Sequence, residues 1–361
     1  MDARQRFLNT LNYRPVDRGF YGMWVGWWPE TAQRWQTEGF DPQVGHGFAT
    51  DPYAWHGGWF FPNPPFAHEV VAEDAETITY VNHEGILLRE RRDNPHSSMP
   101  QFVRFPVETR ADFRRFWAER MQPDLVARLG ADYAAGLAAC RTREAPLIVI
   151  ADRWGGFFGG PRNLTGVENL CLLFYDDPAF VEEMMDTTAD FLIAMMDQIL
   201  LHTDIDVFGF WEDMAYKTAP LLGPEMVRRF MLPRYRRVVE HLRAKGVQWF
   251  ALDSDGDISS LIPVWLDAGI NILYPFEVQC GMDVLQVRKQ YGRDLRLWCG
   301  IDKRALALGP AAIDAELRRI RPLFEEGGYI PGLDHSMPPD VSYPHFRYYM
   351  ERLWDLVNGR L

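Results

Sequence analysis

Short apolar runs alternate with longer segments of helical periodicity along most of the chain. Runs of strand length fall at 19–25, 145–151, 207–210, 247–252, 270–274, 295–298 and 329–330. Apolar residues at helical spacing fill the segments between them, above all 178–202, 224–245, 311–325 and 343–357. Strands that alternate with helices predict right-handed crossovers and a parallel sheet. With an eighth strand expected in the irregular stretch 40–105, the pattern predicts an α/β fold, a (β/α)8 TIM barrel.

One segment departs from this alternation. Residues 77–81 and 86–90 are rich in strand-forming residues and flank Asn82-His83-Glu84-Gly85, which predicts a β-hairpin inserted in the N-terminal part. The sequence shows neither a composition break nor a repeat that would mark a second domain. Residues 1–361 are therefore predicted to form a single domain.

Charged residues follow almost every predicted strand. In chain order they are Asp152 and Arg153, Glu212 and Asp213, Asp253 and Asp255, Glu277, Asp302 with Lys303 and Arg304, and Asp334 with His335. The carboxyl ends of barrel strands converge on one mouth, so these side chains are predicted to line a pocket. Carboxylates crowded in such a pocket raise one another's pKa and need protons, cations or a metal. The alternative, that the acids cap the following helices, is favoured for Asp257 but not for Asp253 and Asp255 together.

Charge and cysteine usage exclude several classes of partner. A net charge of −12 argues against nucleic acid or an anionic membrane surface as the main partner. The four cysteines have no C-x-x-C spacing and fit a reducing cytosol. The N-terminus lacks the apolar core of a signal peptide, and no apolar run approaches the roughly 20 residues of a membrane span. A cytoplasmic location is expected.

The aromatic content is high, at 14% with 13 tryptophans. Trp24, Trp27 and Trp28 lie in and just after the first predicted strand, where core packing and the wall of a flat apolar ligand site are both open interpretations. The run Gly155-Gly156-Phe157-Phe158-Gly159-Gly160 lacks the spacing of a nucleotide-binding loop. It favours a loop that bends closely over the pocket, with a phosphate cradle as the weaker alternative.

Several motifs in one order resemble the uroporphyrinogen decarboxylase superfamily. They are Trp211-Glu212-Asp213-Met214-Ala215-Tyr216-Lys217, Asp253-Ser254-Asp255-Gly256-Asp257, Pro275-Phe276-Glu277-Val278, Gly281-Met282-Asp283-Val284, Gly300-Ile301-Asp302-Lys303, and Gly327-Gly328-Tyr329-Ile330-Pro331 followed by Asp334-His335. The resemblance implies a (β/α)8 barrel with its site at the strand C-termini. It also implies one of two chemistries: cofactor-free decarboxylation of uroporphyrinogen, or zinc-dependent methyl transfer that involves corrinoid proteins.

The chain departs from both branches of that superfamily. The decarboxylase has an arginine-rich segment after its first strand, whereas Met23-Trp24-Val25-Gly26-Trp27-Trp28 contains no arginine. The zinc methyltransferases carry His-x-Cys where this chain has Asp253-x-Asp255, and His335 matches the late histidine of the family. If a divalent metal is bound, zinc or another, the expected ligands are Glu212, Asp253, Asp255 and His335.

These observations favour a methyltransferase of the divergent branch, of the O-demethylase type. It would pass a methyl group from a small methoxylated or methylated substrate to a corrinoid-carrying partner protein. Asp253, Asp255 and Glu212 are predicted to bind a metal or act as general acid, and His335 to orient or donate a proton. Substrate contacts are predicted from Trp24, Trp27, Trp28, Arg153, Tyr216, Lys217, Glu277 and Lys303.

Two alternatives to methyl transfer stay open at this point. One is a decarboxylase of uroporphyrinogen or another carboxylic acid, against which the missing arginine segment argues. The other is a non-catalytic ligand-binding barrel, which the missing thiol ligands keep open. Because members of the superfamily are often dimers, a homodimer is also expected.

Overall fold

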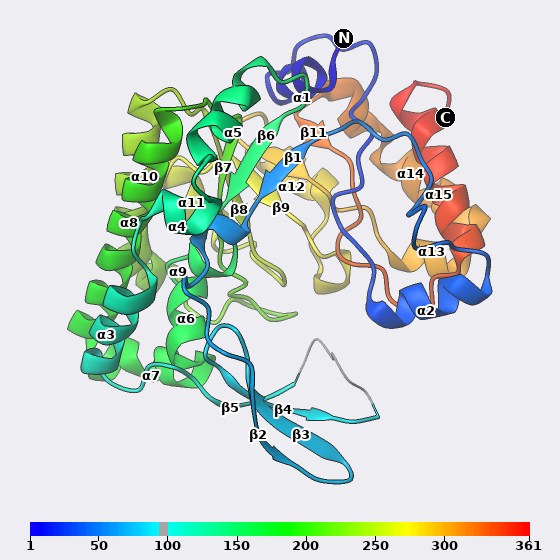
Figure 1. The fold of residues 1–361 in the computed structure, drawn as a ribbon. Helices are drawn as coiled ribbons and strands as arrows, with labels where there is room; N and C mark the ends of the chain where they lie inside the picture. The colour runs from blue at the N-terminus through cyan, green and yellow to red at the C-terminus, as the bar shows by residue number, and fades with distance from the viewer. Residues whose placement is uncertain (94–99) are drawn as a thin grey trace.

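A parallel sheet lies at the centre of the computed structural model, which describes residues 1–93 and 100–361 (Figure 1). The described residues form seven strands in the order β1-β6-β7-β8-β9-β10-β11, and every neighbouring pair is parallel. They are β1 (Ala54–His56), β6 (Leu147–Ile150), β7 (Val207–Trp211), β8 (Trp249–Asp253), β9 (Ile272–Tyr274), β10 (Arg296–Trp298) and β11 (Tyr329–Ile330). Because all strands run the same way, their C-terminal ends meet at one edge of the curled sheet.

The strand expected at 19–25 is wrong, and no eighth strand closes the barrel within the described ranges. Residues 19–25 are buried in part and run without a strand ladder. They are held by single contacts, such as the Asp51 N–H that donates to the Tyr21 carbonyl at 2.7 Å and the Gly19 N–H that donates to the Val357 carbonyl at 2.8 Å. The strand expected within 40–105 is β1, which pairs with β6. A buried extended segment has the same apolar pattern as a paired strand, so the sequence could not separate them.

Helices pack on the outer face of the sheet and cross one of its ends. Their bounds are α1 (Ala3–Leu11), α2 (Pro29–Thr37), α3 (Arg110–Arg120), α4 (Leu125–Leu129), α5 (Tyr133–Ala139), α6 (Gly159–Thr165), α7 (Val167–Asp176), α8 (Pro178–Leu200), α9 (Pro224–Met226), α10 (Leu232–Ala244), α11 (Ile262–Asp267), α12 (Val284–Tyr291), α13 (Arg304–Leu308), α14 (Pro310–Glu326) and α15 (Tyr343–Val357). None of the helices in the described ranges combines the length and apolarity that crossing a membrane requires.

The segment 224–245, predicted as one helix, is divided. A π-helical turn, η4 (Val227–Met231), separates α9 from α10. Pro233 has no N–H to donate to the carbonyl of Arg229, and a proline in that place disturbs the regular helical hydrogen bonding. The rest of α10 continues regularly and carries Tyr235, which is fully buried.

The hydrophobic core has two parts, one on each face of the sheet. Along β8, Trp249 belongs to the concave cluster whereas Phe250 belongs to the cluster beneath the helices, because successive strand residues point to opposite faces. Phe7 of α1 joins the concave cluster. Arg4 of the same helix pairs with Asp206, directly before β7, at 2.9 Å. Helix α1 therefore covers the N-terminal ends of the strands, and a site is left at their C-terminal ends.

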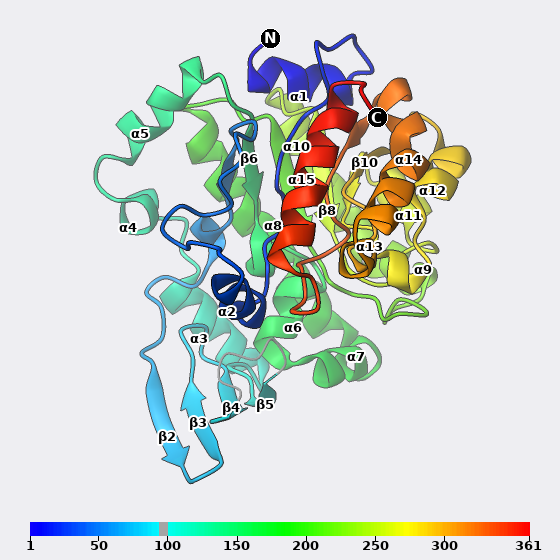
Figure 2. The ribbon, with the colours of Figure 1, turned by 90° about the vertical axis from the view of Figure 1, so that its right-hand side faces the viewer.

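A four-stranded antiparallel sheet projects from the body on the side opposite α1 (Figures 1 and 2). It consists of β2 (Glu69–Glu73), β3 (Thr77–Val81), β4 (Leu87–Arg91) and β5 (Gln101–Arg104). Strands β3 and β4 pair with Val81 opposite Leu87, across a turn in which the Asn82 side chain accepts the N–H groups of Glu84 and Ile86. The insertion predicted as a hairpin is thus part of a larger sheet.

Candidate active site

Inward-facing side chains lie side by side where β7, β8 and β9 end. The register places Trp211 of β7 opposite Asp253 of β8, and Asp253 opposite Tyr274 of β9. Asp253 continues the inward series of β8 that begins with Trp249. Trp298 of β10 follows, with its ring centroid 5.2 Å from that of Tyr274. The strand ends therefore place one carboxyl group within a row of aromatic rings.

A cavity of about 400 Å³ opens over this row. Trp24 and Trp55 also line it, and their ring centroids lie 4.6 Å and 5.8 Å from that of Trp298, in edge-to-face contact. The lining consists of Trp24, Val25, Gly26, Trp55, Trp211, Asp213, Asp253, Asp255, Tyr274, Pro275, Trp298, Cys299, His335 and Ser336. A cavity of this size suits a small molecule. Two wider hollows lie away from the strand ends, beside the chain termini and between β5 and α7.

Three carboxyl groups line the cavity, and they differ in their partners. Asp213 pairs with Arg162 at 2.9 Å, and Asp255 pairs with His335. The Asp253 carboxyl has no ion pair and no hydrogen bond with any residue that the structure describes. Burial, together with the charges of neighbouring carboxylates, raises the pKa of Asp253 well above its usual value. Asp253 therefore holds its proton more tightly than an ordinary aspartate.

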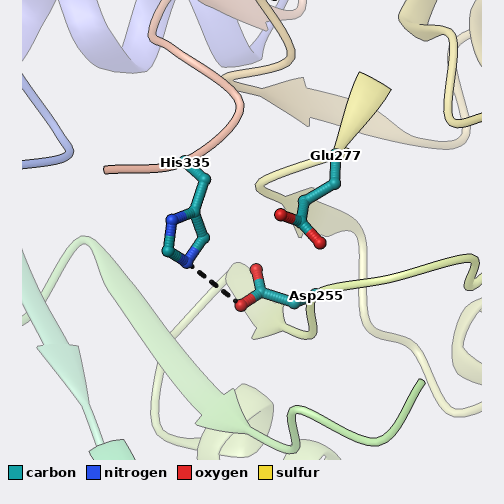
Figure 3. A group of neighbouring side chains, drawn as sticks. All are labelled: Asp255, Glu277 and His335. Carbon is teal, nitrogen blue, oxygen red and sulfur yellow. Dashed lines mark ion pairs between the residues drawn. The ribbon is translucent and has the colours of Figure 1, made fainter. Parts of the chain in front are cut away.

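Asp255, Glu277 and His335 gather beside the cavity from the loops after β8, β9 and β11 (Figure 3). The His335 Nε2 atom lies 3.2 Å from Asp255 Oδ2. On the other side, the His335 ring stacks on Trp28 at a centroid distance of 5.8 Å. Burial lowers the pKa of His335, but the hydrogen bond and charge of Asp255 outweigh this effect, so the pKa is raised. The arrangement favours an imidazolium–carboxylate pair.

The same three residues offer ligand atoms that all lie within 4.8 Å of one another, and two carboxylates and an imidazole suit a divalent cation in type. However, Lys303 Nζ already lies 3.6 Å from Glu277 Oε1, and its ammonium charge opposes a metal there. Glu277 also accepts the Gly256 N–H at 3.0 Å and the Cys280 thiol at 3.4 Å. Burial and the Glu277 charge raise the pKa of the Cys280 thiol to about 12, so this sulfur keeps its proton. The three candidate ligands include no sulfur atom, so a thiolate zinc site does not fit this set.

Glu212 does not join the other predicted site residues. Its buried carboxylate accepts the N–H of Phe157 at 2.8 Å on Oε1, and those of Phe158 at 2.6 Å and Gly159 at 2.9 Å on Oε2. The Tyr235 hydroxyl donates to Oε1 as well. Both oxygens are thus occupied beneath the start of α6, and Glu212 is outside the cavity lining. The structure gives this carboxylate an anchoring position, not the metal-binding or acid role predicted for it.

The glycine-rich run 155–160 makes this anchoring possible. A Cβ atom on Gly156 would lie 1.9 Å from the carbonyl oxygen of Trp211, and one on Gly159 would lie 2.3 Å from the same atom. Only glycine permits so close an approach. The N–H groups that could have cradled a phosphate bind the Glu212 carboxylate instead. The loop bends closely over the end of β7, whereas the sequence predicted that it bends over the pocket, and residues 155–160 are outside the described cavity lining.

The remaining predicted contacts divide into two groups. Trp24 lines the cavity, Trp28 stacks on His335, and Glu277 and Lys303 form an ion pair beside it. Outside the lining lie Trp27, Arg153, Tyr216 and Lys217. Trp27 packs against Trp35 at 5.2 Å, Arg153 pairs with Glu84 at 3.5 Å, and Tyr216 is 64% exposed.

Asp213 lines the cavity, as its place after a predicted strand indicated, but sequence reasoning missed several other residues of the lining, among them Trp211, Tyr274, Trp298 and Cys299. For two of these residues, the sequence did contain a signal, namely their position at the end of a predicted strand. Tyr274 and Trp298 are the last residues of the predicted strands 270–274 and 295–298, which is the position that faces a pocket at the strand ends.

The family model for uroporphyrinogen decarboxylase (URO-D) matches residues 124–355. The match covers more than half of the 361 residues, and the chain therefore belongs to the uroporphyrinogen decarboxylase family. This confirms the superfamily that the strand-end motifs resemble. No curated protein sequence matches the chain.

Among solved structures, a methyltransferase from Methanosarcina mazei has a TM-score of 0.60 at 14% identity, covering 98% of this chain and 99% of that one. At this identity the likeness concerns the fold. A Xaa-Pro dipeptidase with bound methionine (TM-score 0.33, 13% identity, 63% of this chain and 59% of that one) is a partial match. KGPDC from Streptococcus mutans (TM-score 0.27, 13% identity, 61% and 92%) is another, and neither carries an argument about this chain.

Proposed function

We propose that the chain is a methyltransferase that moves a methyl group from a small methoxylated or methylated substrate to a corrinoid-carrying partner protein. The observation that carries the proposal is the Asp253 carboxyl, unpaired among the residues that the structure describes, in a cavity walled by tryptophans. Aromatic walls favour a small, largely apolar ligand, and a buried acid with a raised pKa suits protonation of a leaving oxygen. Family membership and the likeness in fold to a methyltransferase support the same proposal.

In the proposed reaction, the bond between the methyl carbon and the substrate oxygen breaks, and its electron pair stays on oxygen. Asp253 gives that oxygen a proton, so the substrate leaves as an alcohol or a phenol. The corrinoid, when its partner protein presents it, supplies the nucleophilic cobalt that accepts the methyl group. The Asp255–His335 pair keeps a further proton beside the cavity, and Lys303 balances the charge of Glu277.

A turnover assay with a panel of methoxylated aromatics and a reduced corrinoid protein tests the proposal, with the demethylated product followed by chromatography. Asp253→Asn is compared with Asp257→Asn, the same change in the same loop, because the Asp257 side chain binds Ser259 outside the cavity lining. Loss of a general acid should lower turnover by about 100-fold or more in Asp253→Asn and not in Asp257→Asn. A folded wild-type enzyme that demethylates no member of the panel would refute the proposal.

Decarboxylation is the second candidate, because a buried acid also suits delivery of a proton to the carbanion that loss of CO₂ leaves. Charge disfavours uroporphyrinogen as the substrate. Its carboxylates would meet Asp213, Asp253 and Asp255, and no arginine or lysine belongs to the described cavity lining. Formation of coproporphyrinogen from added uroporphyrinogen would establish this activity directly.

The metal suggested by the zinc-dependent relatives stays a prediction. Asp255, Glu277 and His335 would be its ligands, and a bound cation would polarise the leaving atom of the substrate. The ammonium group of Lys303 lies beside Glu277 and opposes a metal ion there. The proposed reaction is therefore written without a step that uses a metal.

A further inference from the structure

We propose that the cavity recognises a small N-methylated ammonium cation that also carries a hydroxyl group. The inference names the substrate class of the proposed methyltransferase, and it rests on that function only in treating this cavity as the substrate site. Three features of the described residues carry it: the aromatic walls, a carboxyl group without a counter-ion among them, and buried hydrogen-bond donors without acceptors among them.

Five aromatic side chains surround the cavity, and these are Trp24, Trp55, Trp211, Tyr274 and Trp298. The Trp24 and Trp55 rings stand at 87° and 71° to the Trp298 ring. The three rings thus meet edge to face and turn differently oriented surfaces toward the cavity that they line. One face of Trp211 already carries the Arg162 guanidinium, 5.0 Å from the ring centroid. An enclosure of aromatic faces attracts cations within about 6 Å and is a common means of recognising quaternary ammonium groups.

The carboxyl groups supply the opposite charge. Asp213 and Asp255 have partners of their own in Arg162 and His335. Asp253 has none in the part of the chain that the structure describes. Without a cation beside it, the protonated form of Asp253 is favoured, and a neutral methoxylated ligand does not change this. An ammonium ligand stabilises the ionised form and pairs with it. Toward this substrate class Asp253 is therefore a counter-ion, in place of the proton-donor role that a methoxylated substrate requires.

Three side chains of the cavity lining have a buried donor without a partner among the described residues. Tyr274 is 8% exposed and Trp298 is 1% exposed, and both line the cavity. The three donors are the Tyr274 hydroxyl and the Nε1 atoms of Trp24 and Trp298. An unsatisfied buried donor is costly, so a ligand that brings an acceptor atom is favoured. Because carboxyl groups already line the cavity, a neutral hydroxyl fits this role better than a carboxylate.

Methyl transfer from such a substrate balances without a proton from the protein. The bond between the methyl carbon and nitrogen breaks, and its electron pair stays on nitrogen. The methyl carbon bonds to the electron pair that the partner's reduced corrinoid supplies. The product nitrogen is neutral at that moment, so the attraction to the aromatic walls and to Asp253 weakens and favours release.

The matched ligands choline and 3,3-dimethyl-1-butanol test the inference in a binding experiment on the purified protein by titration calorimetry. The two have nearly the same shape, but carbon replaces the charged nitrogen in the second. Choline should bind at least about tenfold more tightly, because only the cation gains from the aromatic faces and the carboxylate. Equal binding of the two, or no binding of choline, would overturn the inference.

Variants separate the parts of the proposed site. Asp253→Asn should weaken both choline and tetramethylammonium by about tenfold or more, whereas Asp257→Asn should change neither. Tyr274→Phe should weaken choline but not tetramethylammonium, since only choline has a hydroxyl for Tyr274 to bind. Circular dichroism verifies the fold of each variant. Undiminished choline binding by Asp253→Asn, or equal weakening of both ligands by Tyr274→Phe, contradicts the assignment.

The binding assay and the turnover assay can refute the ligand class and the proposed function separately. Selective choline binding without methyl transfer to a corrinoid protein supports the ligand class and refutes the proposed function. Demethylation of neutral methoxylated aromatics by a protein that does not bind ammonium ligands supports the function and refutes the ligand class.

Discussion

The Nε2 atom of His335 lies 3.2 Å from the Oδ2 atom of Asp255. The contact joins the loop after β11, at one edge of the parallel sheet, to the loop after β8 in its middle (Figure 3). Trp28, from the N-terminal part of the chain, stacks on the same imidazole. Three distant segments therefore meet at His335, directly beside the cavity that Asp253 enters.

Replacing His335 tests whether this pair supports catalysis. His335→Gln keeps a polar side chain of similar size but removes the positive charge opposite Asp255. We expect methyl-transfer turnover to fall by about 100-fold or more, the scale of a lost proton-transfer group. His202→Gln is the matched control, because His202 packs against Tyr133 away from the cavity. Equal turnover in both variants would remove His335 from the catalytic machinery.

Asp253→Asn should stabilise the protein at pH 7 while it removes activity. The half-buried carboxyl lies near like charges and has no counter-ion among the described residues, so a neutral side chain of the same shape relieves an unfavourable interaction. We expect the free energy of unfolding to rise by about 1–2 kcal/mol, the usual gain when a strained functional group is relaxed. Denaturant unfolding measures the change, and Asp257→Asn should stay within about 0.5 kcal/mol of wild type. A less stable Asp253→Asn would contradict this account of the charges.

Glu212→Gln should have the opposite effect on stability. Three backbone N–H groups and the Tyr235 hydroxyl converge on this carboxylate, and the NH₂ group of Gln would turn a donor toward donors. The loss should be about 2–4 kcal/mol, because several buried donors lose their acceptor. The comparison is Glu225→Gln on the exposed surface, and thermal unfolding of the two variants distinguishes them. Equal melting temperatures would show that the anchoring is weak.

The pH dependence of stability provides a separate test of Glu212. Burial raises the pKa of Glu212 above its ordinary value of 4.5, although its hydrogen-bond donors offset part of the effect. The folded protein thus holds this proton to a higher pH than the unfolded chain does. The contribution of Glu212 to stability is therefore largest below pH 4.5 and falls as the pH rises through the folded pKa. Unfolding free energies from about pH 4 to about pH 8 should show this fall in wild type relative to Glu212→Gln. If the unfolding free energy of wild type instead rises with pH relative to that of Glu212→Gln, the raised pKa of Glu212 is contradicted.

Treatment with a chelator tests whether a metal ion at Asp255, Glu277 and His335 contributes to stability. Because Lys303 pairs with Glu277 and His335 pairs with Asp255, dialysis against a chelator should leave the melting temperature unchanged. Lys303→Met removes the competing ammonium charge and should tighten zinc binding in a calorimetric titration. One metal ion per chain in the untreated wild-type protein, lost together with stability on chelation, would contradict this expectation.

The sequence by itself determined the parallel sheet and the end of it that carries the chemistry. Buried parallel strands read as short apolar runs, and β6 to β11 coincide with such runs. It did not determine how the sheet is completed at the N-terminus. Residues 19–25 are as apolar as a strand but lack ladder partners, whereas the short β1 carries Trp55 to the cavity.

Only the tertiary structure decided which strand-end acids share the cavity. Glu212 and Asp253 each stand at the end of an apolar run, and the sequence treats them alike. In the structure, Trp211 is the inward residue in register with Asp253, so Glu212, one residue later, turns outward beneath α6. Neighbouring strand residues point to opposite faces of the sheet. A difference of one position in register therefore places Asp253 in the cavity lining and Glu212 under the loop that it anchors.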